Sequence, residues 1–67
     1  MNIKGTARRK PGGWVVESVD GKEYQMVGGD FQPRMEGLSV RIVGLPESDM
    51  DAFFGTPKII VQKLNVL

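Results

Sequence analysis

The segment from Trp14 to Val27 contains two alternating apolar and polar runs that meet at Asp20-Gly21. An Asp-Gly pair between alternating runs is the strongest short-range signal for a β-hairpin, because the glycine adopts the positive φ that a tight turn requires. Short strands joined by tight turns are typical of small all-β folds. This segment therefore constrains the fold class more than any other, although it does not set the function.

The register of the hairpin follows from which side chains must share a face. A two-residue turn at Asp20-Gly21 mixes polar and apolar side chains on one face. A three-residue loop over residues 19–21 instead collects four side chains on one face, because opposed residues in a sheet share a face. These are Trp14, Val16, Tyr24 and Met26. The sequence therefore predicts the three-residue loop, which opposes Glu17 to Glu23 at a cost of roughly 0.2–1 kcal/mol.

Composition limits the chemistry that the chain can carry. Its 67 residues include no cysteine and no histidine, which excludes disulfides and the usual zinc sites. The commonest catalytic bases and the thiol nucleophile are missing for the same reason. We therefore expect one small domain over residues 1–67, with no enzymatic activity, no cofactor and no metal.

Charge and hydropathy indicate the cellular compartment and the classes of partner to expect for such a domain. Nine basic and eight acidic residues give a net charge of +1, which is not the strongly basic footprint of a nucleic-acid-binding domain. No apolar run approaches the roughly 18 residues of a membrane-spanning helix, and residues 1–5 lack the apolar core of a signal peptide. We therefore expect a cytoplasmic protein with no membrane partner.

The remaining segments predict three further strands. In the first, residues 3–9, Gly5 indicates a bend or a bulge. The fourth, residues 38–44, is stopped by Pro46. The last, residues 58–66, has two apolar pairs that are out of phase, and a bulge near Gln62-Lys63 returns both to the core. The side chains then expected inward are Ile3 and Ala7, Leu38, Val40 and Ile42, and Ile59, Val61, Leu64 and Val66.

Residues 30–37 are the only segment in which a helix is expected, and they are long enough for one turn. Asp30 is the expected N-cap, and Gly37 is the expected left-handed residue at its end. Phe31 and Met35 lie four positions apart, so a helical turn directs both toward one end of the core.

Three strands, a short turn and two more strands make an all-β chain that hides its sheet edges best by closing into a barrel. Four features carry a family resemblance: Gly5, the Asp20-Gly21-Lys22 hairpin followed by Tyr24, the strand from Gly37 to Gly44, and Phe54-Gly55-Thr56-Pro57. In these the chain resembles small, largely uncharacterised bacterial OB-fold-like proteins. The resemblance implies a five-stranded OB-like Greek-key barrel with its helix between strands three and four. The helical segment is shorter than that fold usually has, which leaves an SH3-like barrel as the alternative.

A barrel of this type usually binds its ligand on the outer face of strands two and three, between two flanking loops. The first expected loop covers residues 8–13, and the second expected loop covers residues 47–56. Cations beside aromatic rings suit single-stranded nucleic acid, because charges pair with phosphates and rings stack on bases. The candidate ligand-binding residues are Arg8, Arg9, Lys10, Trp14, Phe53 and Phe54.

Two observations weigh against nucleic acid. Trp14 aligns with the inward face of the hairpin, where a core role is more common. The outer face is acidic to neutral and repels phosphate, because it carries Val15, Glu17, Glu23 and Gln25. The leading hypothesis is therefore protein–protein contact or self-association, through the Val15/Val27 face or an exposed strand edge. Single-stranded nucleic-acid binding through the two loops is the alternative.

Overall fold

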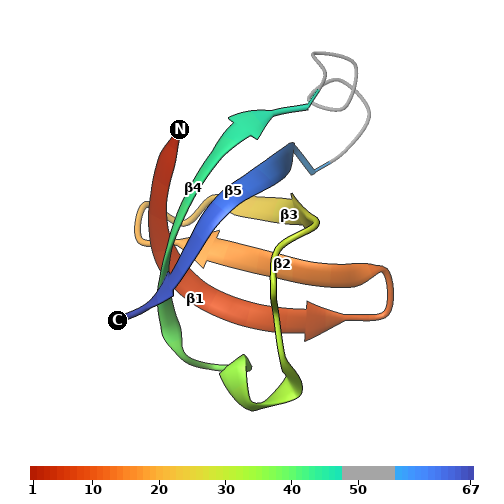
Figure 1. Cartoon of the computed structure of the whole chain (residues 1–67), viewed down its shortest axis with the longest axis vertical. Helices are drawn as coiled ribbons and strands as arrows, with labels where there is room; N and C mark the ends of the chain where they lie inside the picture. Colours follow the sequence, from red (N-terminus) through yellow and green to blue (C-terminus); the bar gives the residue numbers. More distant parts are fainter. Residues whose placement is uncertain (48–55) are drawn as a thin grey trace.

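Strands account for most of the chain in the computed structural model, which describes residues 1–47 and 56–67 (Figure 1). Over these residues the strands are β1 (Asn2–Lys10), β2 (Gly13–Ser18), β3 (Glu23–Val27), β4 (Ser39–Pro46) and β5 (Lys58–Val66). A single 3-10 turn, η1 (Pro33–Met35), lies between β3 and β4. The all-β prediction is therefore confirmed, and the last strand has the bounds expected from the sequence.

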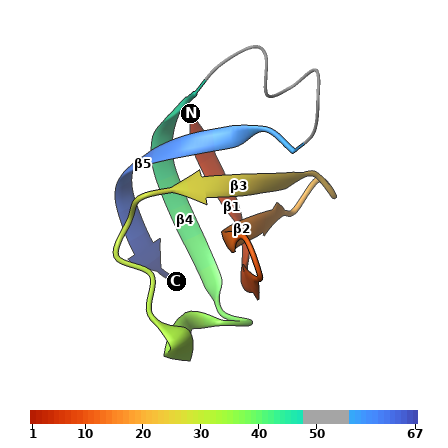
Figure 2. The same cartoon turned by 90° about the vertical axis from the view of Figure 1, so that its right-hand side faces the viewer.

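The described strands close into a barrel in the order β1-β2-β3-β5-β4, and β4 returns to pair with β1. β3 and β5 pair in parallel, whereas the other neighbouring pairs are antiparallel. Figures 1 and 2 show the connection that leaves β3, carries η1 and enters β4 at the end of the barrel farther from the N-terminus. This five-stranded barrel is consistent with an OB-like or SH3-like barrel, and η1 has the position that the OB-like resemblance predicts.

β1 is shared between the two sides of the barrel, and it curves along its length (Figure 1). Its first half pairs with β4 and its second half pairs with β2, and Gly5 takes part in both pairings. A Cβ at Gly5 would overlap the backbone carbonyl of Glu17. Over its whole length β1 has no register shift. The glycine therefore accommodates the close approach of the β2 backbone where the strand bends, and the alternative of a bulge is wrong.

The β2–β3 hairpin has the predicted register. Val16 opposes Tyr24, and the Ser18 N–H donates to the Lys22 carbonyl oxygen at 2.7 Å, which closes the three-residue loop. Gly21 has a φ of +89°, a conformation that glycine adopts without steric penalty. The face-sharing argument from sequence is thereby confirmed.

The loop of this hairpin carries a stabilised carboxylate at Asp20. The backbone N–H of Lys22 donates to Asp20 Oδ1 at 3.0 Å, which lowers the pKa of Asp20 from its ordinary value. A carboxyl whose pKa is lowered by folding stabilises the fold above its unfolded pKa, and that contribution is lost as the pH falls through the folded pKa. The hairpin is therefore weakened only in acid.

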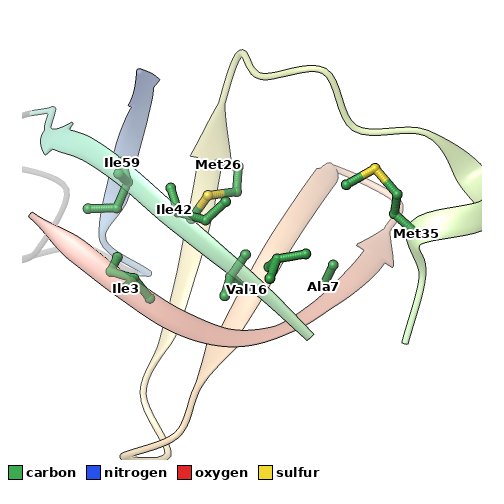
Figure 3. Packing of buried hydrophobic residues seen from close by; sticks show 8 residues of the cluster. Ile3, Ala7, Val16, Met26, Met35, Ile42 and Ile59 are labelled. Carbon is green, nitrogen blue, oxygen red and sulfur yellow. The ribbon is translucent and has the colours of Figure 1, made fainter. Parts of the chain in front are cut away.

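The barrel interior holds one cluster of buried side chains, to which every described strand and η1 contribute (Figure 3). The cluster consists of Ile3, Ala7, Val16, Met26, Met35, Val40, Ile42 and Ile59. Trp14, Tyr24, Phe31, Val61 and Leu64 are partly buried and pack against it. Leu38 and Val66 were expected inward but are 41% and 51% exposed, because Leu38 precedes β4 and Val66 ends β5.

β5 contains the bulge expected from its two out-of-phase apolar pairs. Its register with β4 shifts between Val43 and Gly44, and Gln62 is the residue left without an opposite partner. One extra residue reverses the phase of a strand. Val61 and Leu64 therefore both pack against the core.

The 3-10 turn begins later than the sequence indicated. Its N-cap is Gln32, not Asp30, because Pro33 holds the preceding residue in an extended conformation and occupies the first helical position itself. The Gln32 N–H donates to the Met35 sulfur at 3.3 Å, and the Met35 side chain is buried. Gly37 follows with a φ of +84°, as predicted.

Two glycines give a matched test of this account. We expect Gly5→Ala to destabilise the fold by about 3 kcal/mol or more, because the new Cβ overlaps backbone that moves only if two strands part. Gly21→Ala places its Cβ in open space, so only the positive φ is penalised, by about 1–2 kcal/mol. Urea denaturation measures both free energies of unfolding, and equal losses would contradict the close approach at Gly5.

Candidate functional site

The outer face of the barrel is organised in rows, because residues opposed across strands lie side by side. Three of these rows form the candidate site. The acidic row contains Thr6, Glu17 and Glu23; the basic row contains Arg8, Val15, Gln25 and Lys58; the apolar row contains Val27, Ile60 and Leu45.

The basic run at residues 8–10 lies in a strand, whereas the sequence placed it in a loop. β1 extends to Lys10 and β2 begins at Gly13, so only Pro11 and Gly12 connect them. Gly13 has a φ of +126°, which lets the chain reverse in so short a turn. The expected six-residue binding loop is therefore a tight hairpin.

Placement in a strand separates the three cations, because side chains alternate between the two faces of a strand. Arg8 and Lys10 lie on the outer face, opposite Val15 and Gly13. Arg9 opposes Trp14 and lies on the other face. Arg8, Arg9 and Lys10 therefore do not converge on one ligand.

The outer face is more basic than the hairpin alone indicated. β1 brings Arg8 beside Val15, and the parallel pairing of β5 brings Lys58 beside Gln25. Arg8 Nε lies 3.9 Å from Glu17 Oε2, and both side chains are about half exposed. An exposed ion pair of this kind contributes at most about 1 kcal/mol. Glu17 opposes Glu23 as expected, so the carboxylates gather toward the β2–β3 turn.

Val15 is buried, with 6% of its surface exposed, and the expectation of a Val15/Val27 contact face is wrong. Val15 does not belong to the interior cluster. Its register instead places it between Arg8 and Gln25 on the outer face. The Gln25 side-chain amide donates to the Gly12 carbonyl oxygen at 3.3 Å. The neighbours of Val15 across the strands, Arg8 and Gln25, both have long side chains, which are able to cover a short valine.

Val27 belongs to an exposed apolar surface with other partners. Val27 opposes Ile60, and Ile60 opposes Leu45. The three side chains are 37%, 42% and 51% exposed. Single exposed apolar residues need no explanation, whereas these three are neighbours across three strands and form one continuous apolar surface.

Ile60 and Leu45 were not predicted as site residues, although the sequence carries one signal for Ile60. Ile60 stands between two inward-facing neighbours, Ile59 and Val61, and side chains alternate along a strand. One of three consecutive apolar residues must therefore face out. That Leu45 and Val27 lie on either side of it depends on strand pairings between residues distant in sequence.

Trp14 is half-buried and stacks on Phe31, with ring centroids 5.2 Å apart and planes 18° apart. Both rings pack against the interior cluster, so Trp14 is part of the core boundary, as its inward phase indicated. Gly29 makes room for this stack, because a Cβ there would lie 3.0 Å from the Phe31 ring. Through this ring pair, Phe31 of the connection between β3 and β4 packs against the strand-built core.

Phe53 and Phe54 lie outside the described residues. Within residues 1–47 and 56–67, no three side chains from Asp, Glu, His or Cys form a group able to hold a metal ion. No helix in that part of the chain has the length and apolar character needed to cross a membrane. The chain matches no protein-family model, no curated protein and no solved structure. Its function is therefore inferred from its own surface.

The aromatic stack has a direct spectroscopic test, because Trp14 is the only tryptophan. We expect Phe31→Leu to destabilise the fold by about 1 kcal/mol through loss of the ring pair. The tryptophan emission should also move to longer wavelength as water reaches the indole. Leu38→Ala, at an exposed apolar position, is the control and should leave the emission unchanged. An unshifted Phe31→Leu spectrum would contradict the stack.

Proposed function

We propose that the chain is a non-enzymatic, cytoplasmic binding module that makes protein–protein contact through the apolar row. The observation that carries this proposal is the direct opposition of three exposed apolar side chains on three neighbouring strands. Their burial against a partner is favourable, because it removes apolar surface from water.

The backbone beneath the row supports the same proposal. Val27, Ile60 and Leu45 all lie on strands of the closed barrel. A surface held by paired strands is preorganised, so little conformational entropy is lost when a partner binds.

A partner protein could also bind by adding a strand to an edge of the sheet, but the structure favours this mode of contact less. β3 and β5 pair over only three residue pairs, from Gln25–Lys58 to Val27–Ile60. Beyond them, β5 carries a bulge at Gln62 and then Lys63. Bulges and lysines are the features by which natural proteins discourage pairing at an edge. The side-chain surface of the apolar row is therefore the proposed contact.

Site-specific cross-linking tests this proposal. A photoreactive phenylalanine analogue at position 60 is expected to cross-link one predominant protein in the cells that naturally produce the chain. The same analogue at position 41, an exposed site on β4 outside the apolar row, is the control and should give no such adduct.

A substitution within the row completes the test. Leu45→Asp should lower the yield of the position-60 adduct by about tenfold, because a carboxylate in the contact must be desolvated. Leu45 is half exposed, so the thermal midpoint should change little. Equal yields at positions 60 and 41, or a yield that Leu45→Asp leaves unchanged, would sink the proposal.

Single-stranded nucleic-acid binding remains a second candidate, and one observation favours it. Arg8 and Lys58 lie in the same row of the outer face, where a phosphate backbone would cross. Glu17 and Glu23 lie in the adjacent row and oppose it. We therefore rank this function below protein contact.

An oligonucleotide titration distinguishes the two functions. We expect no complex tighter than about 10 μM at physiological salt, and a salt slope no steeper than about −2, because few phosphates are contacted. Arg8→Ala with Lys58→Ala should abolish what binding there is, whereas Arg9→Ala should not. Fluorescence anisotropy of a labelled strand measures each. A salt-sensitive submicromolar complex that requires Arg8 and Lys58 would promote nucleic acid to the leading function.

A further inference from the structure

The flanks of the apolar row bear on the chemistry of its partner. Lys58 precedes Ile60 by two positions on the same face of β5 and lies in the basic row. Lys63 opposes Val43 on the outer face and lies on the other side of Ile60, beyond the bulge. Along β5 the exposed apolar surface is therefore bracketed by two ammonium groups.

Few carboxylates among the described residues lie close to Lys58 and Lys63. The ion pair that the described residues form within 4 Å joins Arg8 of the basic row to Glu17 of the acidic row, and it involves neither lysine. Among the described residues, Glu47 lies beside this strand: its backbone N–H donates to the Lys58 carbonyl oxygen at 2.9 Å. Lys58 and Lys63 are two cations against the one carboxylate of Glu47, so the charge that the described residues place around the apolar row is net positive.

A second copy of the chain fits this surface poorly. A twofold dimer built on the apolar row places β5 of one copy over β5 of the other. If the two β5 strands run antiparallel, Lys58 of each copy lies over Lys63 of the other. If they run parallel, each lysine lies over its own equivalent, so a lysine meets a lysine in both arrangements. Such like-charge contacts disfavour a complex.

We infer that the apolar row binds an acidic–apolar segment of a partner protein, in which carboxylates flank an apolar side chain. The inference rests on the proposed function and specifies its partner. The two lysines are about 16 Å apart along β5, at about 3.3 Å per residue, and four positions of an extended segment span about 13 Å, a difference that the long lysine side chains bridge. An extended segment matches this span when it carries acidic residues two positions before and two positions after its apolar residue, since alternate side chains share a face.

Two capped synthetic peptides test the inference on the ¹⁵N-labelled chain. The probe is Asp-Thr-Leu-Thr-Asp, and the control is Lys-Thr-Leu-Thr-Lys. In heteronuclear NMR titrations to millimolar peptide, we expect the probe to shift the amide signals of Val27, Leu45 and Ile60. The lysine peptide should bind at least about fivefold more weakly, because two exposed charge contacts change from attraction to repulsion.

Charge reversal provides the matched protein variants. Lys58→Glu with Lys63→Glu should invert the preference between the two peptides. Lys4→Glu with Lys22→Glu changes net charge equally at exposed positions away from the row, and should leave the preference intact.

The outcomes separate this inference from the proposed function. Equal binding of both peptides, or no shift at the apolar row with the acidic probe, would overturn the acidic–apolar partner. Neither result bears on the position-60 adduct, which decides whether the row contacts protein at all. A position-60 adduct consisting of two copies of the chain would also overturn the inference, in favour of self-association.

Discussion

The double pairing of β1 is the constraint on which the rest of the barrel depends. β1 pairs with β4 through its first half and with β2 through its second half, and the two pairings overlap at Gly5 and Thr6. The β2 backbone at Glu17 and Ser18 approaches Gly5 so closely that no Cβ fits. This overlap bends β1 and closes the sheet on itself, and the closure gives the buried side chains a common interior. The order of rows on the outer face follows from the same closure.

The outer surface depends in turn on β5. Its parallel pairing with β3 brings Ile60 beside Val27, and its antiparallel pairing with β4 brings Ile60 beside Leu45. The bulge at Gln62 reverses the phase of the strand, so Lys63 joins the outer face while the core stays filled. One irregularity therefore keeps the core packed and also places a cation beside an exposed apolar surface.

The functional interpretation rests on how charge and apolar surface are divided over this outer face. The carboxylates lie toward the β2–β3 turn, the cations cross the middle, and the apolar side chains lie beyond them over β3, β5 and β4. A long anionic strand laid across the face would meet Glu17 and Glu23 as well as Arg8. A short partner segment on the apolar row avoids those carboxylates and still reaches Lys58. The outer face is therefore better suited to a short protein segment than to a nucleic-acid strand.

The sequence by itself determined the features set by local geometry and alternation: the hairpin register, the positive φ of Gly21, the phase of each strand and the bulge in β5. Each of these follows from side chains a few positions apart, because one slipped residue exchanges the two faces of a strand. Only the tertiary structure decided which surface is exposed. Val15 is buried between strand partners Arg8 and Gln25, and Leu45 and Ile60 meet only through the pairing of β4 with β5. Exposure depends on contacts between residues distant in sequence, and no local pattern contains them.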